Sequence, residues 1–142
     1  MNLLIKRQHT GQPLVQLPTG ALEYVGFSAY RLQAGQTLPV QAGQQELCLV
    51  LLSGLANVSG EAPGHGAFNW EAIGDRQSVF EDKSPFAVYL PPASQAQVQA
   101  LNDVHIAVCA APGASDAGLG PRLIAPQGMK RSVRGKGANT RY

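Results

Sequence analysis

The stretch ELCLVLLSG, residues 46–54, begins with the strongest apolar run in this chain of 142 residues, Glu46–Leu52. Side chains alternate between the two faces of a β-strand, so a strand that is apolar at every position has two faces to bury. Ser53-Gly54 is typical of a two-residue hairpin turn, which would lead into a second strand at Leu55–Val58. The run therefore predicts a strand at the centre of a β-sandwich or β-barrel.

Further strand-like segments recur about every ten residues around this run, as in small antiparallel sandwiches and barrels. They are Leu22–Leu32, Ala67–Ile73, Ser78–Phe80, Phe86–Leu90, Gln95–Leu101 and Val104–Ala111. We expect a loop at Ser59–Gly66, which is rich in Gly and Pro, and a hairpin turn at Asn102-Asp103. No stretch has sustained helical periodicity. The pattern predicts an all-β antiparallel fold, closed or nearly closed so that edge strands are protected.

The composition is that of one globular domain, with 44% apolar and 14% charged residues. No run approaches the roughly 18 apolar residues of a membrane span, and the first ten residues lack the apolar core of a signal peptide. Cys48 and Cys109 lie inside apolar runs, which favours two buried free thiols over a disulfide or a reactive site. We therefore expect a cytoplasmic protein with no membrane partner.

Several groups of residues together carry a family resemblance along nearly the whole chain. They are YVGF at 24–27, YRL at 30–32 with AG at 34–35, ELCLVLLSG at 46–54, RQSVFE at 76–81, VYLPP at 88–92, and RGKG at 134–137 with NTR at 139–141. In these segments the chain resembles the 5-deoxy-glucuronate isomerase family. The resemblance implies a cupin-type antiparallel β-barrel (a jelly-roll-like sandwich), present twice in proteins of about double this length. It also implies an aldose–ketose isomerisation in myo-inositol catabolism.

The metal-binding cupin pattern is G(X)5-H-X-H-(X)3,4-E-(X)6-G, followed by a second motif with another His. These residue types suit borderline divalent metals, which take imidazole nitrogens and a carboxylate. Counted from Gly35, the two His positions hold Gln41 and Gly43. The carboxylate position falls near Glu46 or Leu47, and the later His position falls near Gln97. One carboxylate on a strand cannot hold a metal, so we expect no metal site and no catalytic residue in this chain.

The three histidines, His9, His65 and His105, do not restore a site, because no two of them have ligand spacing in the sequence. The resemblance places the divalent metal and the isomerase chemistry in a second cupin. Residues 1–128 are then a degenerate cupin barrel, and residues 129–142 are a basic interdomain linker that leads to that second cupin. On this interpretation the chain is the amino-terminal, non-catalytic domain of the isomerase, inactive by itself, and its partner is the second domain.

An alternative stays open, in which the chain is a stand-alone, metal-free cupin that binds a small sugar acid or acts as a regulatory or scaffold protein. The resemblance also leaves a homo-oligomer open.

The charge of the chain is divided unevenly, because residues 1–116 hold five basic and nine acidic residues whereas the residues after Asp116 hold six basic and no acidic ones. Besides an interdomain linker, the tail could be a substrate contact in which Arg134, Lys136 or Arg141 pairs with the carboxylate of a sugar acid. A nucleic-acid patch needs interleaved aromatic residues, and Tyr142 is the only one in the tail. We expect no nucleic-acid partner.

Overall fold

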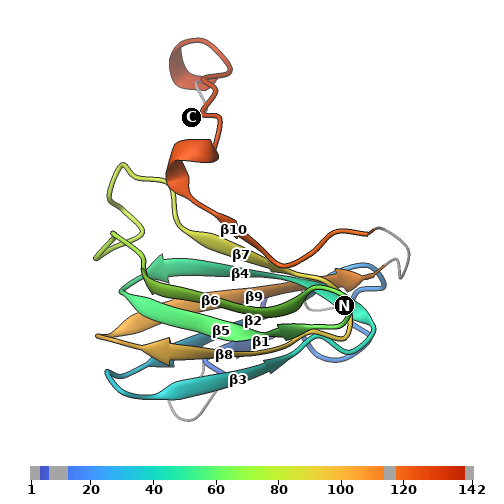
Figure 1. The fold of residues 1–142 in the computed structure, drawn as a ribbon. Helices are drawn as coiled ribbons and strands as arrows, with labels where there is room; N and C mark the ends of the chain where they lie inside the picture. Colours follow the sequence, from blue (N-terminus) through green and yellow to red (C-terminus); the bar gives the residue numbers. More distant parts are fainter. Residues whose placement is uncertain (1–3, 7–12, 114–117, 140–142) are drawn as a thin grey trace.

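The computed structural model describes residues 4–6, 13–113 and 118–139. Within them the chain forms ten strands and two short 3₁₀ helices (Figure 1). The elements are β1 (Val15–Gln16), β2 (Gly26–Leu32), β3 (Thr37–Gln41), β4 (Gln45–Ser53), β5 (Ala56–Ala62), β6 (Gly66–Ile73), β7 (Ala87–Leu90), β8 (Gln95–Ala100), β9 (Val104–Pro112), β10 (Arg122–Ile124), η1 (Pro126–Gly128) and η2 (Gly137–Asn139). None of the helices in these ranges is long and apolar enough to cross a membrane.

The strands build two antiparallel sheets that pack face to face (Figure 1). One sheet has six strands in the order β1-β2-β9-β4-β7-β10, and the other has four in the order β3-β8-β5-β6. This confirms the all-β, jelly-roll-like sandwich. Among the described residues no ladder of hydrogen bonds joins the two sheets, so the sandwich stays open where a closed or nearly closed barrel was expected.

Both predicted two-residue hairpins are wrong, because each turn carries the chain from one sheet to the other. Ser53-Gly54 connects β4 of the six-stranded sheet to β5 of the four-stranded sheet, and Asn102-Asp103 connects β8 to β9 in the opposite direction. The two crossings contact each other: the Leu55 backbone N–H donates to Asn102 Oδ1 at 2.7 Å. A local turn signal cannot show whether the next strand pairs with its predecessor or packs across from it.

Two further expectations need correction. The predicted loop Ser59–Gly66 is mostly strand, because β5 continues to Ala62 and β6 begins at Gly66. A Cβ on Gly60 would lie 2.1 Å from the carbonyl oxygen of Gln95, so this glycine allows β5 to approach β8 closely and does not mark a turn. The predicted strand Ser78–Phe80 is part of the loop between β6 and β7.

Alternate residues of β4 form the centre of the core, where Leu47, Leu49 and Leu51 are buried. Val58, Val98 and other side chains of the four-stranded sheet face them across the sandwich. Cys48, Val50 and Leu52 alternate with the buried leucines and are half-buried on the opposite face of β4. Cys48 and Cys109 are free thiols, as predicted, although both are half-buried where full burial was expected.

We expect Gly54→Ala to destabilise the fold much more than the matched control Gly64→Ala. Both glycines have a positive φ, +96° and +78°, at which alanine costs about 1 kcal/mol or more. A Cβ at residue 54 would also lie 2.3 Å from the Asp103 carbonyl oxygen, whereas residue 64 has open space. Overpacking should add about 1–3 kcal/mol to the loss in unfolding free energy. Equal losses for the two variants in urea unfolding would contradict the close contact between the crossings.

Candidate functional site

A cavity lies at the open edge of the sandwich, between β1–β2 on one side and β3 on the other. Its volume is about 440 Å³. The connection Leu17–Val25 contributes one wall, and β2, β3, β4 and β9 contribute the others. Polar lining residues are Gln16, Thr19, Glu23, Ser28, Tyr30, Gln41 and Gln45; apolar ones include Leu38, Val40, Leu47, Val108 and Ala110.

The lining of this cavity offers hydroxyls, amides and one carboxylate, that of Glu23. No Lys, Arg or His is among the described residues that line it. Hydroxyl and amide groups can exchange hydrogen bonds with the hydroxyls of a sugar or polyol. A sugar acid would meet the Glu23 carboxylate and no compensating cation, so its charge is not matched here.

The four positions of the cupin metal pattern do not come together. Gln41 is exposed at the rim of the cavity, and Gly43 lies in the turn between β3 and β4 with φ +59°. The Gln97 side chain lies on the outer face of the four-stranded sheet, where its Nε2 donates to Ser59 Oγ at 3.4 Å. Val40, which precedes Gln41 on β3, is the residue that faces the interior there, and it is buried.

Glu46 is likewise directed away from the cavity. It lies on the outer face of the six-stranded sheet and accepts a hydrogen bond from the Tyr89 hydroxyl at 3.1 Å. Burial raises the pKa of Tyr89, and the hydrogen bond and negative charge of Glu46 raise it further. In the described ranges no group of three or more His, Cys, Asp or Glu side chains could hold a metal ion. The residues at the cupin motif positions therefore do not fit a divalent metal.

The histidines lie on separate elements. His65 is exposed in the turn between β5 and β6, and His105 is half-buried on β9, in the other sheet. His9 lies outside the described residues.

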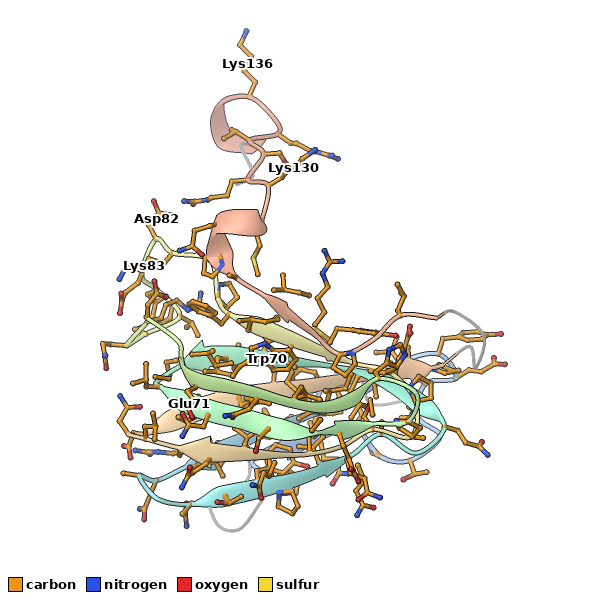
Figure 2. All side chains as sticks on the ribbon, viewed as in Figure 1. Trp70, Glu71, Asp82, Lys83, Lys130 and Lys136 are labelled. Carbon is orange, nitrogen blue, oxygen red and sulfur yellow. The ribbon has the colours of Figure 1, made fainter. Side chains whose placement is uncertain are left out.

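The basic residues of the tail also stay apart from the cavity. Arg134 and Lys136 are exposed on a segment that stands away from both sheets, with Lys136 near its tip (Figure 2). Arg141 lies outside the described residues. The tail is linked to the body through an ion pair between Arg131 and Asp82. The structure thus brings none of the described candidate cations to the cavity.

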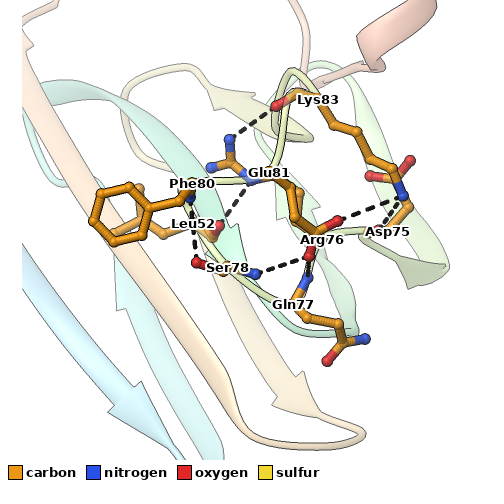
Figure 3. A network of polar contacts seen from close by, with 8 residues as sticks. All are labelled: Leu52, Asp75, Arg76, Gln77, Ser78, Phe80, Glu81 and Lys83. Carbon is orange, nitrogen blue, oxygen red and sulfur yellow. Dashed lines mark hydrogen bonds and ion pairs between the residues drawn. The ribbon is translucent and has the colours of Figure 1, made fainter.

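The loop between β6 and β7 is held by a polar network that the sequence did not predict (Figure 3). Arg76 is buried, and its guanidinium donates to the carbonyl oxygens of Leu52 at 2.9 Å and Lys83 at 3.0 Å. Glu81 accepts hydrogen bonds from the backbone N–H groups of Gln77 and Ser78 at 2.6 and 3.1 Å. Hydrogen bonds of Arg76 therefore connect the RQSVFE segment to Leu52 on β4, in the six-stranded sheet.

The two packed antiparallel sheets have a cupin-like fold. A mutant of Bacillus subtilis oxalate decarboxylase is similar in fold, with a TM-score of 0.54 at 16% identity over 70% of this chain and 25% of that chain. An IolB-like protein from Salmonella typhimurium LT2 is much more similar, with a TM-score of 0.85 and 36% identity over 96% of this chain and 51% of that chain.

The sequence matches the KduI/IolB family over residues 3–142, and the chain belongs to this family. The 5-deoxy-glucuronate isomerase of Geobacillus kaustophilus (strain HTA426) is 46% identical over 116 residues, 81% of this chain and 39% of that protein. The 5-deoxy-glucuronate isomerase of Bacillus subtilis (strain 168) is 30% identical over 120 residues, 84% of this chain and 42% of that protein. The chain thus spans less than half the length of these curated relatives.

We expect Arg76→Met to lower the unfolding free energy by about 1–3 kcal/mol, because it removes the charged donor of two part-buried hydrogen bonds and leaves the carbonyl oxygens of Leu52 and Lys83 without it. Arg76→Lys should lose less, since an ammonium can still satisfy one of the two acceptors. Urea unfolding of both variants measures the difference. A loss below about 0.5 kcal/mol for the Met variant, the level of an ordinary surface change, would show that the network does not hold this loop.

The Tyr89–Glu46 pair predicts a stability change in alkali. The pKa of Tyr89 is raised above its usual 10.0 in the folded protein. The contribution of the neutral phenol to the free energy of unfolding is therefore complete below about pH 10, and it is lost as the pH rises through the folded pKa. Tyr89→Phe should flatten this alkaline decline and remove one phenol that ionises above the usual range in an ultraviolet titration. Glu46→Gln should move that ionisation to lower pH. An ionisation of Tyr89 that stays at the same pH in the Glu46→Gln variant would refute the pairing.

Proposed function

We propose that this chain is the amino-terminal, non-catalytic cupin domain of a 5-deoxy-glucuronate isomerase of inositol catabolism. One observation carries the proposal: the cupin metal positions hold Gln41, Gly43 and Gln97 and no histidine. Gln41 and Gln97 face outward on the four-stranded sheet, whereas Glu46 lies on the outer face of the six-stranded sheet. A family member built this way needs another source of metal ligands and reacting groups. We assign both to a second cupin domain.

The size of the relatives supports this division. The matched region makes up 39% of the Geobacillus kaustophilus protein and 51% of the Salmonella IolB-like chain, which leaves room for a second domain of similar size. In this proposal residues 1–128 form the first domain and residues 129–142 form the linker. The divalent metal is held by the second domain, and the described residues of this chain contribute no ligand to it.

The tail has the properties that a linker requires. Its basic residues Lys130, Arg134 and Lys136 are exposed, and the ion pair of Arg131 with Asp82 fixes its base against the β6–β7 loop (Figure 2). These cations are then available to the second domain, or to the carboxylate of a uronate substrate bound there. We propose the same role for Arg141, because it lies in the same basic segment of the sequence.

The direct test is isomerase activity on 5-deoxy-glucuronate. We expect the purified chain to show no turnover above background when supplied with divalent metals, in an assay in which the full-length Geobacillus kaustophilus relative is active. Turnover by the chain at a rate comparable with that relative would place the reacting groups in this domain and end the proposal.

Removal of residues 129–142 tests the division into domain and linker. The deletion breaks the ion pair of Arg131 with Asp82, and exposed ion pairs of this kind contribute about 0–1 kcal/mol. The melting temperature and the circular dichroism spectrum should therefore change little. Asp82→Ala in the full chain is the matched control, because it breaks the ion pair and keeps the tail. Unfolding of the truncated chain would make the tail part of this domain.

The cavity supports a second candidate, a stand-alone protein that binds a small sugar-like ligand. Its hydroxyl and amide lining suits a polyol better than a sugar acid, because the carboxylate of Glu23 is unopposed by any cation among the described lining residues. Titration with D-glucose and D-glucuronate, followed by NMR at Ser28, Tyr30 and Gln41, tests this. Saturable shifts with either compound favour the candidate; the absence of shifts at millimolar concentrations removes it.

A further inference from the structure

The outer faces of the two sheets differ sharply in chemistry. On the four-stranded sheet the outward side chains are polar and bonded to one another: Asn57 Nδ2 donates to Gln99 Oε1 at 3.2 Å, and Asn69 Nδ2 donates to Glu71 Oε1 at 3.2 Å. This is the expected composition of a sheet face that meets water. The outer face of the six-stranded sheet does not follow this rule.

The register of the six-stranded sheet aligns one apolar residue from every strand. This apolar row is Val15, Ala29, Ala107, Val50, Ala87 and Ile124, in strand order from β1 to β10. Adjacent strands lie about 4.8 Å apart, so the row extends for about 24 Å across the sheet. No polar side chain interrupts it.

A second row runs beside the first. It is formed by Phe27, Cys109, Cys48 and Tyr89 on four adjacent strands and ends at Arg122 on β10. Charged groups lie toward the ends of the strands, where Glu46 bonds to Tyr89 and Arg31 pairs with Asp103 at 3.0 Å. An apolar centre with a polar rim is the usual anatomy of a protein–protein interface.

The side chains of the apolar row are small enough to form a flat surface. Val15, Ala29, Val50 and Ile124 are half-buried in the chain, and the small Ala87 and Ala107 between them are buried. A sheet with this composition on both faces is typical of one that is covered on both sides. Its inner face is covered by the four-stranded sheet. The outer face therefore offers a half-buried apolar surface to a partner.

We propose that the outer face of the six-stranded sheet docks the second cupin domain of the longer family proteins. This inference rests on the proposed function, since it identifies where the second domain binds. The last strand, β10, is the edge of this same sheet and supplies Ile124 to the apolar row. The chain continues from that edge through η1 into the tail, which leaves the body beside β7 and β10 (Figure 1).

The linker is long enough for this docking. Residues 129–142 reach at most roughly 45–50 Å when fully extended, about twice the width of the apolar row. A domain joined at the β10 edge can therefore lie flat on the outer face without displacing any described strand. The four-stranded sheet presents its polar ladder on the opposite side of the sandwich and offers no comparable surface.

Cys48 and Cys109 provide a direct readout, because they are register partners in the centre of the outer face. The experiment compares the purified chain with a chimera in which residues 1–142 replace the matched region of the Geobacillus kaustophilus relative. Maleimide labelling at one pH, resolved by peptide mass spectrometry, gives the rate at each cysteine. We expect both cysteines to label roughly tenfold or more slowly in the chimera, because a packed interface excludes water and reagent.

A matched pair of variants identifies the face. Ala29→Glu puts a charge in the apolar row, and Ala67→Glu puts the same charge on an exposed outer position of β6 in the other sheet. In the chimera only Ala29→Glu should restore fast labelling. The comparison of the unsubstituted proteins does not depend on either variant folding well.

The outcomes separate this inference from the proposed function. An active chimera whose cysteines label as fast as those of the isolated chain would overturn the docking face and leave the function standing. The isolated chain could instead form a homodimer in which both cysteines are protected and which Ala29→Glu dissociates. That result would overturn the choice of partner, because a second copy of the chain would then cover the face. Protection in the chimera and a monomeric isolated chain support the proposal, whatever the chimera's activity.

Discussion

The close approach of two backbone crossings organises this molecule. At Gly54 the chain leaves the six-stranded sheet, and at Asn102-Asp103 it returns to it. The two crossings lie so close together that a Cβ at residue 54 would collide with the Asp103 carbonyl oxygen. The hydrogen bond between the Leu55 N–H and Asn102 joins the two crossings. Through them β4, β5, β8 and β9 become the central strands of both sheets, and Leu49, Val58 and Val98 can pack into one core.

The same topology explains why the cavity lies at an edge. The two sheets are connected by crossings and not by a continuous ladder, so β2 and β3 belong to different sheets and remain unbonded to each other. The space between them becomes the cavity, lined by hydroxyl and amide groups. In a cupin that binds metal, this interior is where imidazoles and a carboxylate must meet. Here the strand alternation directs Gln97 and Glu46 to two outer faces instead.

The strand β4 has two apolar faces with different neighbours. Leu47, Leu49 and Leu51 fill the core, whereas Cys48 and Val50 continue an apolar surface on the outside of the sheet. In an antiparallel sandwich of this size the second face would ordinarily be polar, as it is on the four-stranded sheet. The difference between the two outer faces is thus a property of this chain that its own core does not explain.

The sequence by itself determined the all-β class, the position of most strands, the central place of β4 and the family to which the chain belongs. These features depend on residue type and on alternation with period two, both of which are local. It also showed that the metal pattern lacks histidines, because that requires only counting residues. The tertiary structure alone decided that Ser53-Gly54 and Asn102-Asp103 are crossings, that Ser78–Phe80 is a loop held by the buried Arg76, and that Glu46 bonds to Tyr89. Each of these depends on contacts between residues far apart in the chain, and such pairings are set by the packing of whole sheets, which no local pattern encodes.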